Sequence, residues 1–182
     1  RMALFADQTM ATYSPYALKN PDGTKVVSHG KTHWVDPSHP AIRHYNLDLI
    51  TAFCSSGVDE IQLDYVRFPA QYGELATYGD PSIPRDRIIT SFVKEAYAIT
   101  KAHGVLLSLD TYGITIWNHE VDIQTVGQRL ADLAIHCDAI NPMIYPSHYA
   151  PNFGGYKNPA DHPYEIVRWS MEKILKLILL QT

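Results

Sequence analysis

The chain lacks several features that mark common classes of protein. It has 182 residues but only two cysteines, Cys54 and Cys137, which are too few for a disulfide framework. The formal net charge is −4, whereas a nucleic-acid-binding protein favours a basic face. The most apolar stretch, ILKLILL near the C-terminus, is too short to cross a bilayer. We therefore expect no nucleic-acid partner and no membrane span, and we expect two small buried thiols in place of a bridge.

Signatures of nucleotide, cofactor and metal binding are also missing. The sequence contains no GxSxG, no P-loop and no GxGxxG after a predicted strand. The four histidines between residues 29 and 44 look like a cluster, but their spacing matches no known set of metal ligands. We expect neither a metal site nor a cofactor.

Aromatic residues and histidines are plentiful for a chain of this length. Hydrophobic residues make up 46% of the chain and charged ones 19%, which suits a globular protein with a core. There are twelve Tyr, three Trp and nine His, many of them in connections rich in Pro and Gly. Loops crowded with amphipathic rings suit a site that stacks on a flat polar ligand such as a sugar.

Predicted strands and helices alternate along the chain. Apolar runs predict strands at 2–6, 58–68, 105–114 and 139–146. Helical spacing and Pro and Gly boundaries predict helices at 34–57, about 85–103, about 122–136, and from about 163 to the end. In the first of these helices the predicted apolar face consists of Ile42, Tyr45, Leu49 and Phe53. Long loops follow the strands and short turns follow the helices, which predicts a parallel sheet with right-handed crossovers.

The two faces of this sheet differ in polarity, which separates two kinds of parallel fold. One face carries Gln62 and Asp64, Ser108 and Asp110, and Asn141, Met143 and Tyr145. A doubly wound sheet is apolar on both faces, so the pattern favours a (β/α)₈ TIM barrel over that alternative. Only four strands and four helices are found. We therefore expect residues 1–182 to form a partial barrel domain, about half of a barrel whose remaining segments belong to a longer parent chain.

Two aspartates occupy equivalent places in this pattern. Asp64 and Asp110 each lie at the carboxyl end of a predicted strand, in LDY and LDTY. Neighbouring strands are about 4.8 Å apart, so the two carboxylates would fall within the roughly 5–9.5 Å range of glycosidases. We predict a catalytic pair. The structural alternative is that either Asp caps a loop or pairs with Arg67.

Further residues near the strand ends are candidates for binding substrate. Arg67 could bind a sugar hydroxyl, keep Asp64 ionised or form a structural ion pair. The other candidates for substrate binding are Asp7, Tyr112, Trp117, Asn118, Asn141, Tyr145, His148 and Tyr149.

Three long stretches carry a resemblance to a known family. DEIQLDYVRFP (59–69), SLDTYGITIWN (108–118) and INPMIYPSHYAPNFGGYKNPADHPYEIV (140–167) resemble the DUF4015 family of bacterial proteins, which are candidate glycoside hydrolases. The resemblance covers nearly the whole chain and implies a TIM barrel, with this chain at the third to sixth βα units. It places Asp64 at the end of the fourth strand, where many retaining barrel glycosidases keep their nucleophile. Ala6 and Leu63 stand where the family is expected to have Lys and Phe.

Three functions are compatible with these residues. The first is a glycoside hydrolase for a polysaccharide or oligosaccharide, with Asp64 as nucleophile or base and Asp110 as general acid. The second is a non-catalytic carbohydrate-binding barrel, and the third is a hydrolase of another bond, such as an amide or ester. Whether a glycosidase of this kind would retain or invert stays open. For an enzyme of cell-surface polymers we expect a secreted or cell-envelope parent protein.

Overall fold

The computed structural model describes residues 1–13, 15–71 and 76–179, and its main sheet is parallel. The strands are β1 (Met2–Ala3), β4 (Glu60–Asp64), β5 (Leu106–Tyr112) and β6 (Ala139–Met143). They lie in the order β1-β4-β5-β6, so that strands of the sheet that follow one another along the chain are neighbours. The predicted α/β fold with a parallel sheet is confirmed.

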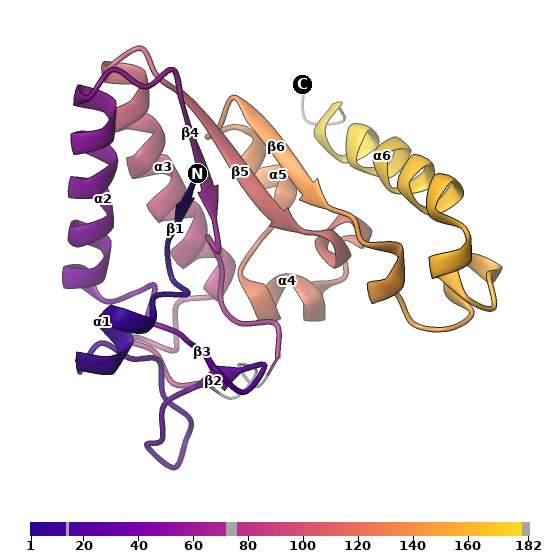
Figure 1. The fold of residues 1–182 in the computed structure, drawn as a ribbon, viewed down its shortest axis with the longest axis horizontal. Helices are drawn as coiled ribbons and strands as arrows, with labels where there is room; N and C mark the ends of the chain where they lie inside the picture. Colours follow the sequence, from indigo (N-terminus) through magenta and orange to yellow (C-terminus); the bar gives the residue numbers. More distant parts are fainter. Residues whose placement is uncertain (14, 72–75, 180–182) are drawn as a thin grey trace.

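Helices flank the sheet and connect its strands (Figure 1). The long ones are α2 (Pro40–Ser55), α3 (Arg85–Ala102) and α6 (Pro163–Leu179), and the short ones are α4 (Glu120–Val126) and α5 (Leu130–Ala134). Figure 1 shows α2 and α3 side by side along one side of the sheet, whereas α6 stands apart beyond β6 and contacts α5.

The core lies between one face of the sheet and the helices α2 and α3. Ile61 and Leu63 of β4 and Leu107 and Leu109 of β5 are buried there against side chains such as Phe92. The register pairs Gln62 with Ser108 and Asp110 with Asn141, so these polar residues share the opposite face. The predicted difference in polarity between the two faces is therefore present in the structure.

The predicted apolar face of the helix at 34–57 is correct at Ile42 and wrong by one position in the later turns. The structure buries Ile42, Asn46, Ile50 and Cys54, which follow one another every four residues. Tyr45 and Phe53 remain 39% and 46% exposed. An amide at the core position 46 is tolerated because Asn46 Nδ2 donates a hydrogen bond to the carbonyl of Ile42 at 3.0 Å. Helix α2 consequently has a second apolar side that no described residue buries.

Two other segments differ from the prediction. The helix predicted at 122–136 is divided into α4 and α5 at Gly127, whose φ is 77° and where a Cβ would lie 2.9 Å from the carbonyl oxygen of Arg85. The predicted loop after the first strand contains helix α1 (Gln8–Tyr13) and a hairpin of β2 (Val27–Ser28) and β3 (Thr32–His33). Residues 72–75 of the loop after β4 and residues 180–182 of the predicted last helix lie outside the described residues.

Both cysteines are free thiols, but only Cys54 is buried as predicted. Cys54 is buried and Cys137 is partly buried, and burial raises the pKa of the Cys137 thiol to about 12. Thiolate is the reactive form, so this thiol is unreactive near neutral pH. Among the residues that the structure describes, no helix is both long and apolar enough to span a membrane.

Candidate active site

Asp64 and Asp110 lie side by side at the carboxyl ends of neighbouring strands. The register pairs Leu63 with Leu109. Asp64 and Asp110 are the next residues of the two strands, so they lie beside each other on the same face of the sheet. Asp64 Oδ2 lies 2.5 Å from Nη2 of Arg1, and Asp110 Oδ2 lies 3.2 Å from Nε of the same guanidinium. The side chains of Asp64 and Asp110 are 8% and 5% exposed, and one arginine therefore bridges a nearly buried acid pair.

Each carboxylate is also oriented by a second donor. Gln62 Nε2 donates a hydrogen bond to Asp110 Oδ1 at 2.6 Å, and the backbone N–H of Tyr65 donates one to Asp64 Oδ1 at 2.7 Å. The negative charge of Asp64, with a smaller contribution from Asp110, outweighs desolvation and raises the pKa of Arg1. The site thus contains two fixed acceptor groups and a permanent positive charge between them.

The chain turns sharply directly after Asp64. Tyr65 has a φ of 52°, a left-handed conformation that is uncommon for a residue with a bulky side chain. Its carbonyl accepts a hydrogen bond from the N–H of Phe5 at 3.3 Å, and its ring packs edge-on against Trp34 at 5.7 Å between centroids. Strain of this kind persists where the surroundings impose it, and it is common at functional sites.

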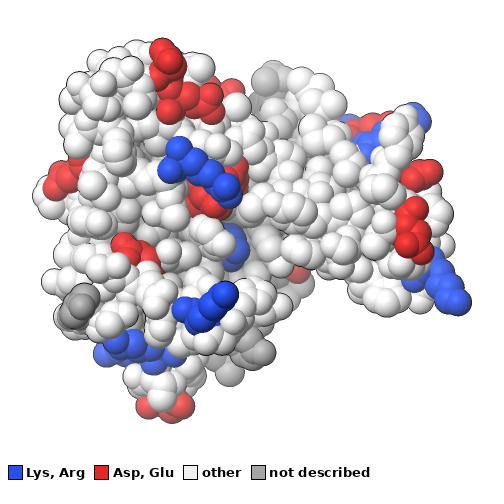
Figure 2. All heavy atoms as spheres, in the orientation of Figure 1, with Lys and Arg blue, Asp and Glu red and all other residues white. Residues whose placement is uncertain are grey.

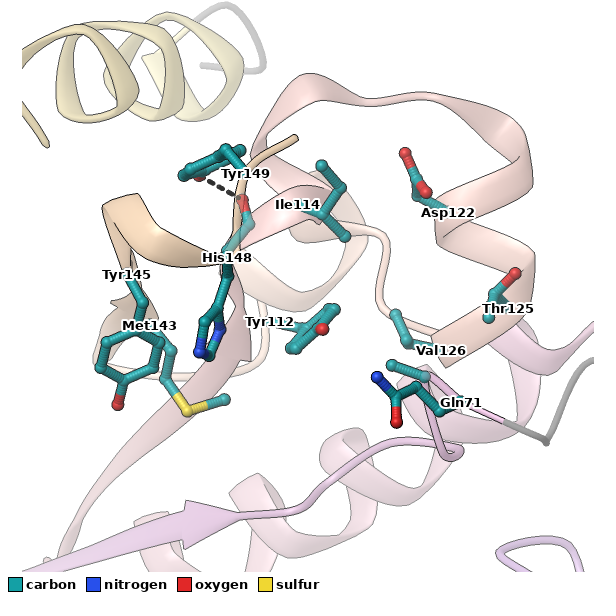
Figure 3. Close-up of a pocket in the computed structure, with 12 residues that line it drawn as sticks. Gln71, Tyr112, Ile114, Asp122, Thr125, Val126, Met143, Tyr145, His148 and Tyr149 are labelled. Atoms are coloured by element: carbon teal, nitrogen blue, oxygen red, sulfur yellow. Dashed lines mark hydrogen bonds between the residues drawn. The ribbon is translucent and has the colours of Figure 1, made fainter. Parts of the chain in front are cut away.

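A groove extends over the two acids and their loops. A hollow of about 430 Å³ contains Asp64, and one of about 310 Å³ contains Asp110 and Asn141. The two share Arg1, Met143 and Tyr145 among their lining residues. A third hollow of about 300 Å³ adjoins the first through Tyr112 and His148. Figure 3 shows Tyr112, Tyr145, His148, Met143 and Gln71 around this third hollow.

The β2–β3 hairpin contributes one wall of the hollow that contains Asp64. Ser28, His29, Thr32 and Trp34 all line it. Trp34 is buried, and its indole N–H donates a hydrogen bond to Ser28 Oγ at 2.8 Å, which fixes the ring. Sequence reasoning missed these residues. The sequence signal that could have found them is Gly30 between two short runs, at 27–28 and 32–33, because Gly favours the positive φ of a hairpin turn. In the structure His29 and Gly30 both have positive φ.

Gln128 is a second residue that sequence reasoning missed. It is fully buried, and its amide nitrogen donates to the carbonyls of Val66 and Asp110 at 3.2 and 3.3 Å. Its amide oxygen accepts from the N–H of Tyr112 at 2.8 Å. These bonds tie the ends of β4 and β5 together and so hold the backbone that carries the acid pair.

Arg67 makes no ion pair with any described residue, so the predicted structural ion pair is absent from this part of the chain. Its guanidinium lies instead over the rings of Trp34, Tyr65 and Tyr112, with Cζ 4.9–5.3 Å from their centroids. Nη1 donates to the carbonyl of Phe68 at 3.0 Å. Burial lowers the pKa of Arg67, and the neighbouring Tyr112, Tyr65 and Asp64 offset this only in part.

Five other residues that were predicted to bind substrate lie along the groove. Tyr112, Asn141, Tyr145 and His148 line its hollows, and the rings of Tyr145 and His148 are in contact at 4.9 Å between centroids. Tyr149 is more buried, and its hydroxyl donates to the carbonyl of Gly113 at 3.5 Å (Figure 3).

Three predicted residues lie elsewhere. Asp7 accepts a hydrogen bond from the N–H of Met10 at 2.9 Å and so caps α1, although we expected it at the mouth of the barrel. Trp117 packs edge-on against Phe153 and Trp169 at 4.9 and 4.4 Å between centroids. Asn118 is exposed and ends a 3₁₀ turn with a φ of 57°. None of the three lines the hollows around the acid pair, because each is engaged in local structure.

The described residues contain no group of three or more His, Cys, Asp or Glu side chains placed to hold a metal ion. The described part of the site contains two carboxylates, two arginines and several aromatic rings. Two adjacent carboxylates are the groups that acid–base and nucleophilic hydrolysis require.

The fold and the site together define an α/β domain with an acid pair at the carboxyl ends of neighbouring parallel strands. Residues 1–181 match the family described as "Putative glycosyl hydrolase domain", DUF4015, and the chain belongs to this family. The resemblance seen in the sequence is thereby confirmed.

Two solved structures are similar to the chain. A hypothetical protein from Ruminiclostridium thermocellum ATCC 27405 is 29% identical over 60% of this chain, with a TM-score of 0.51. The glycoside hydrolase domain of PgaB (BpsB) from Bordetella bronchiseptica shares 10% identity over 97% of this chain, with a TM-score of 0.63, which is a likeness of fold. The chain spans 56% of the length of each of these structures. No curated protein matches the chain.

Proposed function

We propose that this chain carries the catalytic acids of a glycosidase that cleaves a polysaccharide or oligosaccharide by a two-carboxylate mechanism. One observation carries the proposal: two nearly buried carboxylates lie at neighbouring strand ends, on one guanidinium, in a groove lined by aromatic rings. The family and the fold of the PgaB glycoside hydrolase domain support the same class of reaction.

In this proposal Asp64 is the nucleophile or base and Asp110 is the general acid. Asp64 lies at the wall of the larger hollow, where a sugar ring would face it, whereas Asp110 is held between Gln62 and Arg1 beside the neighbouring hollow. The side chain of Arg1 is 60% exposed, so substrate can displace it from the space between the acids. Once Arg1 has moved away from Asp110, that carboxylate can hold the proton that it must give to the oxygen of the leaving group.

We further propose that the sheet is part of a TIM barrel completed by other segments of a longer parent protein. The strands are parallel and follow chain order, and the acids lie at their carboxyl ends, as in barrel enzymes. Apolar side chains of α2 and α6 that are exposed here would be covered by the neighbouring units. A secreted or cell-envelope location fits a polysaccharide substrate.

The roles of the two acids can be separated with two substrates. An aryl glycoside with a dinitrophenolate leaving group needs no proton from the enzyme, whereas a polysaccharide does. We expect Asp110→Ala to lower kcat on the polysaccharide by about 10²–10⁴-fold and to spare the aryl glycoside. Asp64→Ala should abolish activity on both substrates. Equal losses of activity on the two substrates in Asp110→Ala would contradict its role as general acid.

One observation favours a second candidate function, a non-catalytic carbohydrate-binding barrel. Arg1 occupies the space between the acids and pairs with both. If the pair is purely structural, glycans bind in the groove without being cleaved, and Asp64→Asn leaves their binding intact. Measured binding without release of reducing ends in the wild-type protein would establish this alternative.

A further inference from the structure

Arg67 is a buried charge that faces the groove beside Asp64. The residue is only 8% exposed and lines the same hollow of about 430 Å³. Arg1, Arg43, Arg87, Arg129 and Arg168 each pair with a carboxylate. Arg67 has no carboxylate partner among the described residues, although a buried charge without one is costly.

The described surroundings of Arg67 leave one buried donor without a partner. Nη1 bonds the carbonyl of Phe68, but Nε is buried and has no hydrogen-bond partner among the described residues. The rings of Trp34, Tyr65 and Tyr112 lie against the guanidinium. Contacts of this kind stabilise a cation and hold its plane, but they do not satisfy the N–H groups at its edge.

The walls of this hollow are rich in basic groups. Arg1, His29 and His148 line it together with Arg67, whereas Asp64 is the acidic residue among its described lining residues. Arg1 is already paired with Asp64 and Asp110. Basic and acidic side chains meet near the hollowed centre of the face shown in Figure 2. A ligand that brings an anionic group would supply the partner that Arg67 lacks.

We propose that the hollow around Arg67 is a subsite for an anionic sugar, so that the substrate is an acidic glycan. The planar guanidinium binds a carboxylate through its edge, which favours a uronic acid, and a sulfate ester offers related chemistry. This inference rests on the proposed function, because it names the substrate class of the same groove. Asp64 would then act beside a sugar that is held by its charge.

Binding of monosaccharides tests the subsite without any turnover, because they contain no glycosidic bond. We would measure the binding of glucuronate, glucose 6-sulfate and glucose to the full-length protein by calorimetry or ligand-observed NMR at low salt. Glucuronate should bind at least about tenfold more tightly than glucose, since a charge-assisted hydrogen bond is added. A preference for the sulfate over the carboxylate would support the anionic subsite and identify a sulfated glycan as its source.

A matched pair of variants assigns the preference to one side chain. Arg67→Met should abolish the preference for glucuronate over glucose, whereas Lys31→Met removes an exposed charge at the hairpin tip and should keep it. Circular dichroism and the Tm of each variant show whether it is folded. The wild-type comparison remains decisive if Arg67→Met does not fold. Equal affinity of the wild-type protein for glucuronate and glucose, or a preference that survives in folded Arg67→Met, overturns the proposal.

The outcomes also separate this inference from the proposed function. Cleavage of neutral glycans without any preference for acidic ones would leave the glycosidase in place and remove the anionic subsite. Selective binding of acidic sugars without cleavage of any acidic glycan would support the anionic subsite and contradict the glycosidase.

Discussion

Tyr65 shows how a single backbone conformation shapes the candidate site. Its φ of 52° turns the chain away from β4 at the residue after Asp64. In this conformation its N–H reaches the Asp64 carboxylate at 2.7 Å, and its ring reaches Trp34 and Arg67. The turn therefore fixes both the acid and the cation that face the groove.

Two substitutions at this position separate backbone strain from loss of the ring. Tyr65→Asn and Tyr65→Val both remove the aromatic contacts, but Asn tolerates the left-handed region and a β-branched residue does not. We expect Tyr65→Val to be less stable than Tyr65→Asn by about 1–2 kcal/mol in urea unfolding. Equal stability of the two variants would show that the conformation at residue 65 is not held in solution.

Sequence reasoning located Asp64 and Asp110 because the alternation of side chains along a strand is a local property. It did not find Arg1, Gln62 and Gln128 as their partners. These contacts are long-range: Gln62 lies 48 positions from Asp110, Arg1 lies 63 positions from Asp64, and Gln128 lies 18 positions from Asp110. Of the three roles considered for Arg67, the structural ion pair is absent from the described part of the chain, and local sequence does not show that three rings converge on this residue.

At the scale of elements, a partly buried ionic network joins α3 to the segment that carries Gln128. Arg129 Nε lies 2.7 Å from Asp86 Oδ2 in the first turn of α3, and Nη2 lies 2.7 Å from Glu120 Oε1 at the start of α4. Burial acts to raise the pKa of Asp86, but hydrogen bonds from Gln124 and Arg129 and the charge of Arg129 outweigh it and lower the pKa. The network therefore positions Gln128, the residue next to Arg129.

Removal of Arg129 should destabilise the domain and change its response to acid. Arg129→Met leaves the Asp86 carboxylate, which is 3% exposed, without its cation, and we expect a loss of about 2–4 kcal/mol in the free energy of unfolding. Arg168→Met breaks an exposed pair with Glu172 on α6 and should cost less than about 1 kcal/mol. Urea unfolding at pH 7 compares the two, and equal losses would show that this network stabilises the fold no more than an exposed ion pair does.

The sign of the pH effect follows from the lowered pKa of Asp86. The ionised form of Asp86 contributes stability that is fully present above its ordinary pKa of 3.8. This stability is lost as the pH falls through the lower pKa that Asp86 has in the folded protein. The wild-type protein should therefore lose more stability than Arg129→Met between pH 5 and about 3. Parallel stability curves for the two proteins in this range would contradict the assignment.

Element order and type could be predicted well because strands and helices carry strong periodic patterns. The hairpin β2–β3 was missed because each strand has two residues and gives no periodic signal. The division of the helix at 122–136 depends on Gly127 against the carbonyl of Arg85, a long-range contact. The buried row of α2 is decided by its packing on the sheet and α3, since both sides of that helix contain apolar residues.

On the scale of the whole molecule, apolar surface remains at both ends of the sheet. Tyr45 and Phe53 of α2 are exposed beside the β1 edge, and α6 exposes Tyr164, Leu175 and Leu179 at 69%, 52% and 65% beyond β6. Exposed apolar patches of this kind mark interaction surfaces. They fit the proposal that further βα units of the barrel pack against both helices.

A double substitution on α6 tests this proposal in two contexts. In the chain of residues 1–182 alone, Leu175→Gln with Leu179→Gln should reduce self-association in light scattering without loss of stability. In the full-length protein the same change should cost about 2–4 kcal/mol, because the two leucines would be buried there. An unchanged unfolding free energy of the full-length variant would show that α6 is solvent-exposed in the whole protein.

The measurement that tests the central claim most directly is release of reducing sugars from a panel of acidic and neutral polysaccharides. We would compare the full-length protein with its Asp64→Asn variant and with Asp48→Asn, which changes an exposed acid on α2. We predict activity in the wild-type protein and in Asp48→Asn, and none in folded Asp64→Asn. Activity that persists in Asp64→Asn, or silence from the wild-type protein on glycans that it binds, would contradict the assignment of Asp64 as a catalytic acid of a glycosidase.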